Sequence, residues 1–267
     1  MPVLEVNGAK LYYEEHGTSP ETIVFGHSLL FSCRMFDDQV NALKDRLRCV
    51  KFDFRGQGRS EVTRDGYDMD TLTEDAAALI DKLDCTPCHF LGFSMGGFVG
   101  LRLAIRRPEL LRSLILVDTS ADPEPKKNLP KYQLLNIIAR WIGLWAVAGQ
   151  VMPIMFSQTF LKDPGRTDIR KKWRQHLLDN HRVGVTRAVT GVITRQGLYD
   201  QLDKIDLPTL VIVGEQDVAT VPEISERMHA RMPNSRMVRI PNAAHMTPIE
   251  EPDAVNAALQ EFLSSLN

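Results

Sequence analysis

Short apolar runs alternate with segments of helical spacing along most of the chain. The predicted strands are 3–6, 10–14, 22–25, 48–52, 90–91, 114–117, 208–213 and 236–240, and the predicted helices include 36–47, 70–83, 222–232 and 253–266. Asn7-Gly8 is a hairpin turn between the first two strands. The later alternation of strand and helix predicts an α/β fold with a doubly wound, mostly parallel sheet of about eight strands, covered on both faces.

This alternation stops between residues 121 and 200. Three prolines open the segment, the pattern becomes helical, and all three tryptophans of the chain lie within it. We therefore expect residues 1–120 and 201–267 to form the core and 121–200 to form an inserted helical lid. Ligands bind at the carboxyl ends of the strands in such sheets, and the lid is expected to cover them.

Composition narrows the function classes. The 267 residues are 43% hydrophobic and 25% charged, with a net charge of −2, so nucleic acid and anionic membranes are not expected partners. No apolar run approaches the roughly 18 residues that span a bilayer, and the N-terminus lacks an export signal, which predicts a cytoplasmic protein. The pair Cys85–Cys88 precedes a strand instead of opening a helix, so a redox pair is not expected, and no second cysteine or histidine pair completes a zinc site. No other feature of the sequence indicates a metal or organic cofactor, and none is expected. Residues 122–200 carry 13 Lys and Arg against 6 Asp and Glu.

The stretch Gly92-Phe93-Ser94-Met95-Gly96 lies between a predicted strand and a predicted helix. A Gly-x-Ser-x-Gly sequence in this setting is typical of a nucleophile elbow, a strained turn that exposes the serine hydroxyl. The first N–H groups of the following helix lie beside that hydroxyl and can bind an oxyanion.

A serine needs a base and an acid that orients the base. His245 is the histidine that follows the last strand, at the sheet edge where the elbow lies. Asp217, directly after strand 208–213, is the preferred acid, and Glu215 and Asp118 are the alternatives. The chain order Ser, Asp, His is the one expected for this constellation.

The loop that begins at His27 ends another strand at the same edge. We predict an oxyanion hole made by the backbone N–H groups of Leu29 and Met95. His27 is expected to brace this loop instead of acting as a second base, and is counted with the substrate-binding residues. The large lid side chains predicted to line the pocket are Trp141, Trp145, Met155 and Phe156; packing within the lid is the alternative.

Together these motifs resemble the α/β-hydrolase superfamily over nearly the whole chain. His27-Ser28 corresponds to the usual His-Gly, and the turn from Asp53 to Ser60 to a familiar glycine-containing turn. Within the superfamily the chain looks like small lidded esterases and lactonases, and Ser28-Leu29 is similar to the equivalent loop of enol-lactonases.

The resemblance implies a serine esterase or lactonase, with acyl-homoserine lactones among the possible small-molecule substrates and an acyl-enzyme on Ser94. The alternatives are C–C bond hydrolysis or cofactor-free perhydrolysis with the same three residues. A further alternative is a small-molecule receptor that does not turn its ligand over.

Overall fold

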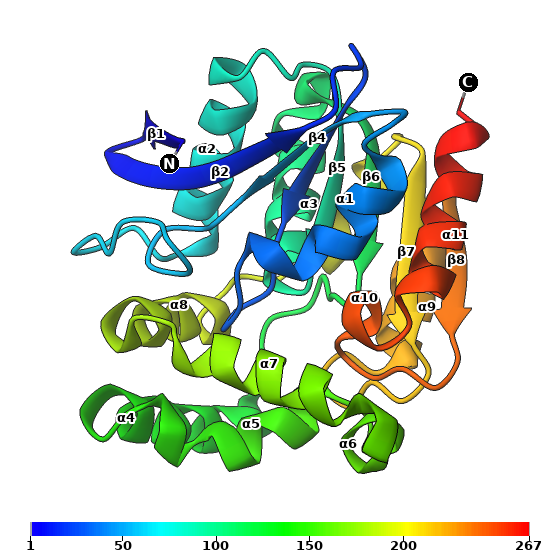
Figure 1. The fold of residues 1–267 in the computed structure, drawn as a ribbon. Helices are drawn as coiled ribbons and strands as arrows, with labels where there is room; N and C mark the ends of the chain where they lie inside the picture. The colour runs from blue at the N-terminus through cyan, green and yellow to red at the C-terminus, as the bar shows by residue number, and fades with distance from the viewer. Residues whose placement is uncertain (1, 267) are drawn as a thin grey trace.

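The computed structural model describes residues 2–266, and its strands form a single twisted sheet (Figure 1). The strand order is β1-β2-β4-β3-β5-β6-β7-β8. The strands are β1 Val3–Val6, β2 Ala9–His16, β3 Thr22–Gly26, β4 Arg48–Phe52, β5 Cys88–Phe93, β6 Leu111–Val117, β7 Thr209–Gly214 and β8 Ser235–Ile240. β2 pairs antiparallel with β1 and β4, and every other pair is parallel. The predicted sheet is therefore confirmed.

Helices cover both faces of the sheet. On one face α1 (Asp37–Leu43) packs against α11 (Pro252–Ser264), and on the other α2 (Met69–Lys82), α3 (Met95–Arg106) and α9 (Pro222–Arg231) lie together. Side chains alternate across a strand, so Phe25 of β3 joins the first apolar cluster and its neighbour Val24 joins the second. This alternation explains why the central strands are apolar throughout.

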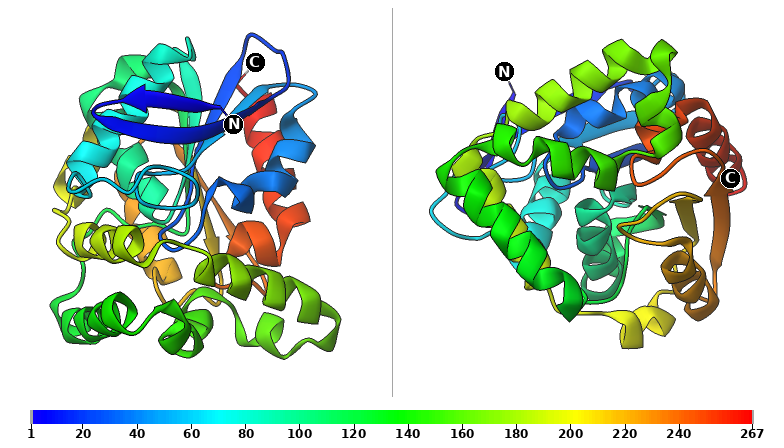
Figure 2. Two further views of the ribbon diagram at one scale, coloured as in Figure 1. Left: turned by 60° about the vertical axis from the view of Figure 1, so that its left-hand side comes forward. Right: turned by 90° about the horizontal axis from the view of Figure 1, so that it is seen from below.

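The segment between β6 and β7 folds as five helices, which we call the inserted helices. They are α4 Leu129–Trp141, α5 Ala148–Met155, α6 Gln158–Lys162, α7 Thr167–Leu178 and α8 Arg182–Ile193. Figure 1 shows α7 and α8 next to the sheet and α4 and α5 beyond them, and Figure 2 shows the same group from below. These helices thus lie over the carboxyl ends of the parallel strands.

Short segments complete the chain between these elements. The four-residue helix α10 is Thr247–Glu250, and 3₁₀ turns occupy Cys33–Phe36, Pro108–Leu110, Lys126–Asn128, Leu144–Ala146, Pro164–Arg166 and Tyr199–Lys204. Within the described part of the chain, no helix is both long and apolar enough to cross a membrane.

Candidate active site

Ser94 occupies the sharp turn between β5 and α3. Its backbone has φ 50° and ψ −108°, a strained conformation for a residue with a side chain. Two glycines make the turn possible, because a Cβ at Gly92 would collide with the carbonyl of Gly96, and a Cβ at Gly96 with the carbonyl of Gly26. Close approach, rather than flexibility, therefore explains both glycines of the motif.

A chain of hydrogen bonds begins at the Ser94 hydroxyl. The Ser94 Oγ atom lies 2.9 Å from Nε2 of His245, and Nδ1 of the same ring lies 2.8 Å from Oδ2 of Asp217. The loop after β7 fixes the Asp217 carboxylate, which accepts hydrogen bonds from the N–H groups of Ala219 and Thr220 and from the Thr220 hydroxyl. The structure thus brings together three residues that are far apart in the sequence.

The electrostatics of this chain follow from its burial and its charges. Burial by itself would lower the pKa of His245, but the Asp217 carboxylate outweighs it and raises that pKa above its ordinary value. Burial works against the charge of Asp217 too, yet His245 and the Thr220 donors hold the pKa of this carboxyl below its usual range. The pair therefore favours a charged acid beside a basic imidazole.

The two alternative acids have different surroundings. Asp118 is fully buried at the end of β6, where its carboxylate accepts hydrogen bonds from the N–H of Gly214 and the hydroxyl of Thr247. Burial, together with the nearby charge of Asp217, raises the pKa of Asp118. Glu215 is exposed to solvent. Asp118 thus joins the loops that carry the acid and the histidine, whereas Asp217 contacts the imidazole.

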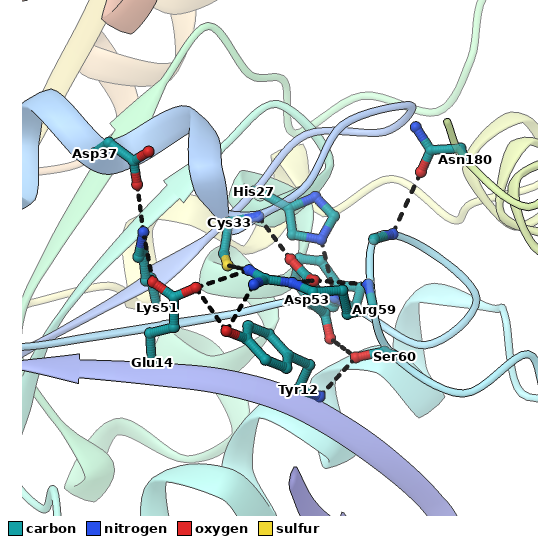
Figure 3. Close-up of polar contacts among 12 residues, drawn as sticks. Tyr12, Glu14, His27, Cys33, Asp37, Lys51, Asp53, Arg59, Ser60 and Asn180 are labelled. Carbon is teal, nitrogen blue, oxygen red and sulfur yellow. Dashed lines mark hydrogen bonds and ion pairs between the residues drawn. The ribbon is translucent and has the colours of Figure 1, made fainter. Parts of the chain in front are cut away.

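The two predicted oxyanion donors, Leu29 and Met95, both line the cavity next to Ser94. His27 holds the peptide that contains the Leu29 N–H. Its Nδ1 lies 2.6 Å from the carbonyl oxygen of Ser28, and its Nε2 accepts a hydrogen bond from the Phe54 N–H at 2.9 Å. Figure 3 shows the His27 ring beside Asp53. A trans peptide directs its C=O and N–H in opposite directions, so a bond to the Ser28 carbonyl fixes the direction of the Leu29 N–H.

His27 is neutral in this arrangement. Its ring is completely buried, and this burial lowers its pKa despite the charge of Asp53 nearby. Nε2 accepts a hydrogen bond from the Phe54 N–H, so the proton of the neutral ring is on Nδ1. The sequence-based expectation that His27 braces the loop agrees with these bonds, whereas His27, also grouped with the substrate-binding residues, is not among the residues that line the cavity.

A cavity of about 210 Å³ opens from Ser94 and His245 toward the inserted helices. Its walls are mainly aliphatic, and most of them come from α4, α5, α8 and the 3₁₀ turn between α4 and α5. The lining includes Leu135, Ala139, Leu144, Val147, Val151, Ile154, Met155, Val185, Val189, Val192 and Ile193, with Tyr132, Asn136, Glu124 and Arg195 as polar neighbours. The Arg195 guanidinium is paired with Glu124 at 3.0 Å, so its charge is balanced locally.

One of the four predicted lid residues, Met155, lines this cavity. Trp141 and Trp145 do not, since they are 78% and 66% exposed on the outer side of the inserted helices. Phe156 is only 1% exposed, but it stacks on Phe160 at 4.9 Å within the apolar core instead of facing the cavity. The three aromatic residues that were predicted to line the pocket therefore do not line this cavity.

The cavity residues that sequence reasoning missed are mostly smaller aliphatic side chains, with a few polar ones among them. Tyr132, Leu135, Asn136 and Ala139 are spaced at i, i+3, i+4 and i+7, which places them on one face of α4. This spacing was a usable signal, but the opposite face of the same helix is also apolar. Helical periodicity alone could not decide which face turns inward.

The cysteines and the metal-ligating residue types form no further site among residues 2–266. Cys33, Cys49, Cys85 and Cys88 are buried free thiols, and no cluster of three or more His, Cys, Asp or Glu side chains could hold a metal there.

The family model described as the alpha/beta hydrolase fold matches residues 21–252, so this chain belongs to the α/β-hydrolase family and is an enzyme of that superfamily. A thermophilic esterase from Thermogutta terrifontis superposes with a TM-score of 0.93 at 28% identity, over 100% of this chain and 99% of the other. The enol-lactonase from Burkholderia xenovorans LB400 gives a TM-score of 0.91 at 28% identity, over 98% and 100%. The 3-oxoadipate enol-lactonase 2 of Acinetobacter baylyi is 27% identical over 92% of this chain and 89% of that protein.

Proposed function

We propose that the protein is a serine hydrolase of carboxylic esters and lactones. The observation that carries this proposal is the chain Ser94 Oγ–His245–Asp217, with contacts of 2.9 and 2.8 Å, at the mouth of an apolar cavity. The similarity of the protein to an esterase and to an enol-lactonase supports an acyl substrate with an oxygen leaving group.

The first step of the proposed mechanism forms the acyl-enzyme. The Ser94 Oγ atom attacks the carbonyl carbon while His245 Nε2 takes the hydroxyl proton, and the π electrons of the carbonyl move to its oxygen. In this mechanism the N–H groups of Leu29 and Met95 donate hydrogen bonds that stabilise the oxyanion. The carbonyl then re-forms, the bond to the leaving oxygen breaks, and the imidazolium protonates that oxygen.

The second step returns the free enzyme. A water molecule gives its proton to His245 and attacks the acyl carbon, the oxyanion forms again, and Ser94 leaves with the proton from the imidazolium. In a lactone the acyl group and the leaving oxygen belong to one ring, so the product is a single hydroxy acid. Asp217 keeps its charge throughout and holds the imidazole in the correct orientation.

The cavity wall supports an apolar acyl group. Aliphatic side chains from three inserted helices surround it, and the charge of Arg195 is balanced by Glu124. Burying an acyl chain there contributes roughly 0.8 kcal/mol for each methylene group. We therefore expect chains longer than acetyl to be preferred until the cavity is full.

The test is hydrolysis of p-nitrophenyl esters from acetate to decanoate, beside acyl-homoserine lactones and simple lactones. Ser94→Ala should lower kcat/KM by at least about 10³-fold. Ser225→Ala is the matched control, because the Ser225 hydroxyl is buried on α9 and has no hydrogen-bond partner among the described residues. The control should keep wild-type activity.

The outcome also separates the other reaction classes. Turnover that survives in Ser94→Ala contradicts the proposal, as does a wild-type enzyme that is inactive on every ester and lactone. In that second case, C–C cleavage, acyl transfer to peroxide and ligand binding without turnover would be tested next, by product analysis and calorimetry.

A further inference from the structure

The loop that carries the Leu29 N–H continues into a strained residue. Leu30 has φ 72°, in the left-handed region that side chains other than glycine rarely adopt. Two side-chain amides hold it there. The Leu30 N–H donates to Oε1 of Gln57 at 2.8 Å, and its carbonyl accepts a hydrogen bond from Nδ2 of Asn180 at 2.7 Å.

These bonds fix consecutive peptides of the loop. His27 holds the peptide between Ser28 and Leu29, Gln57 holds the next one, and Asn180 holds the one after that. His27 and Gln57 come from the core. Asn180 follows α7, so one of the three supports is supplied by the inserted helices.

The side chain of Asn180 joins three segments. Besides the Leu30 carbonyl, its Nδ2 contacts the carbonyl of His176 at 2.9 Å, near the end of α7. Its Oδ1 accepts a hydrogen bond from the Gly58 N–H at 3.3 Å (Figure 3). The residue is only 9% exposed, and all of its polar atoms are used. Donor and acceptor are thus both specified, which an alanine or an aspartate cannot reproduce.

Gln57 connects the same loop to the other proposed donor. Its side chain is buried, its Oε1 holds Leu30, and its Nε2 lies 3.7 Å from the sulfur of Met95. The turn that contains Gly58 therefore holds Leu30 and also contacts the side chain of Met95, and Asn180 bonds to that turn as well.

We propose that Asn180 is a positioning residue that keeps Leu30 in its left-handed conformation and thereby holds the Leu29 N–H toward the developing oxyanion. The inserted helices then contribute to the rate of the chemical step as well as to substrate binding. This inference rests on the proposed function of Ser94 and Leu29. Without the Asn180 bond, Leu30 can relax to a less strained conformation, and the two preceding peptides are then restrained only by His27 and Gln57, so the Leu29 N–H is held less rigidly.

The test compares Asn180→Ala, Asn180→Asp and Arg187→Ala with the wild type. Asn180→Asp keeps an oxygen for the Gly58 N–H but loses the donor to Leu30. Arg187 of α8 makes a different bond between the inserted helices and the core, to the carbonyl of Thr63, and it does not touch the loop. Arg187→Ala is therefore the matched control for a general weakening of the contacts between the inserted helices and the core.

We expect both Asn180 variants to lower kcat by about 10- to 100-fold, less than the 10²–10³ expected for the loss of a whole donor, while KM stays the same. An alkyl trifluoromethyl ketone, whose adduct with a serine carries an oxyanion, should bind more weakly by the same factor. Arg187→Ala should change neither value. Thermal unfolding of each variant shows that the assays are made on folded protein.

Three results would overturn the inference: an unchanged kcat in a folded Asn180 variant, a rise in KM at constant kcat, or an equal loss of kcat in Arg187→Ala. The rate of labelling by an alkyl fluorophosphonate separates this inference from the proposed function. If Ser94 is labelled but no ester is hydrolysed, the proposed function fails. The ratio of labelling rates between wild type and Asn180→Ala still decides the role of Asn180, because phosphonylation also develops charge on an oxygen in the same hole.

Discussion

At the scale of single residues, the most consequential group is His245, whose proton affinity is set by two opposing effects. Burial disfavours the charged ring, and the Asp217 carboxylate, 2.8 Å from Nδ1, favours it more strongly. The charged form is inactive as a base, so the enzyme gains activity as the pH rises through the pKa of this ring.

The first prediction concerns this pH dependence. In the wild type, the rising limb of kcat/KM should lie above pH 6.5, the ordinary value for histidine, because the pKa of His245 is raised. Asp217→Asn removes the charge that raises it and leaves the burial that lowers it, so the limb should move to lower pH. The maximum rate should fall by on the order of 10⁴, the loss found for the same change in a serine protease. A limb that stays in place would contradict the assignment of Asp217.

At the scale of secondary-structure elements, α4 presents two apolar faces. Leu135 and Ala139 line the cavity, whereas Leu134, Ile137 and Trp141 are exposed on the other side. One helix therefore supplies both a wall of the candidate site and a stretch of the molecular surface. Substitutions on the two faces should have separate consequences.

The second prediction uses this difference. Ala139→Phe places a large side chain in the cavity and should lower kcat/KM for decanoate relative to acetate by at least about tenfold, because the longer chain no longer fits. Trp141→Ser, on the outer face of the same helix, should leave the chain-length profile unchanged. The measurement is kcat/KM along the ester series. A profile that shifts equally in both variants would show that the cavity does not receive the acyl group.

At the scale of the whole molecule, the inserted helices and the sheet share one apolar cluster. Trp173 of α7 packs edge-on against Phe31 at 5.8 Å, and Met152 and Leu177 belong to the same cluster as Phe25 and Val255. If the inserted helices and the sheet had separate cores, each could unfold without the other. Because they share one apolar cluster, their unfolding is expected to be coupled.

The third prediction is therefore a single cooperative unfolding transition. The tryptophans all lie in residues 121–200, so their fluorescence reports on the inserted helices, whereas far-UV circular dichroism reports on the whole chain. The two signals should give coincident transitions in urea, since coincidence of independent probes is the test for a two-state change. An earlier fluorescence transition would show that the inserted helices unfold by themselves.

Some residues of the candidate site can be recognised from their neighbours in the sequence, and others cannot. The elbow at Ser94, the loop end at Asp217 and the loop at His245 are each recognised from a few neighbouring residues, because turn chemistry and strand ends are local properties. The sheet edge then brings them together. Asn180 gave no such signal, since it acts through a bond to Leu30, 150 positions away in the sequence.

The order of residues was enough to predict the alternation of strands and helices, the inserted segment, and Ser94 and His245 as partners, and it favoured Asp217 over Glu215 and Asp118. The three-dimensional fold was needed to show that Asp217 contacts His245, which face of α4 turns inward, that Trp141 and Trp145 lie outside, and which side chains hold the loop at Leu30. The physical reason is that the periodicity of a helix shows which of its faces is apolar but not which surface that face packs against. That partner is chosen by packing between segments that are distant in the sequence.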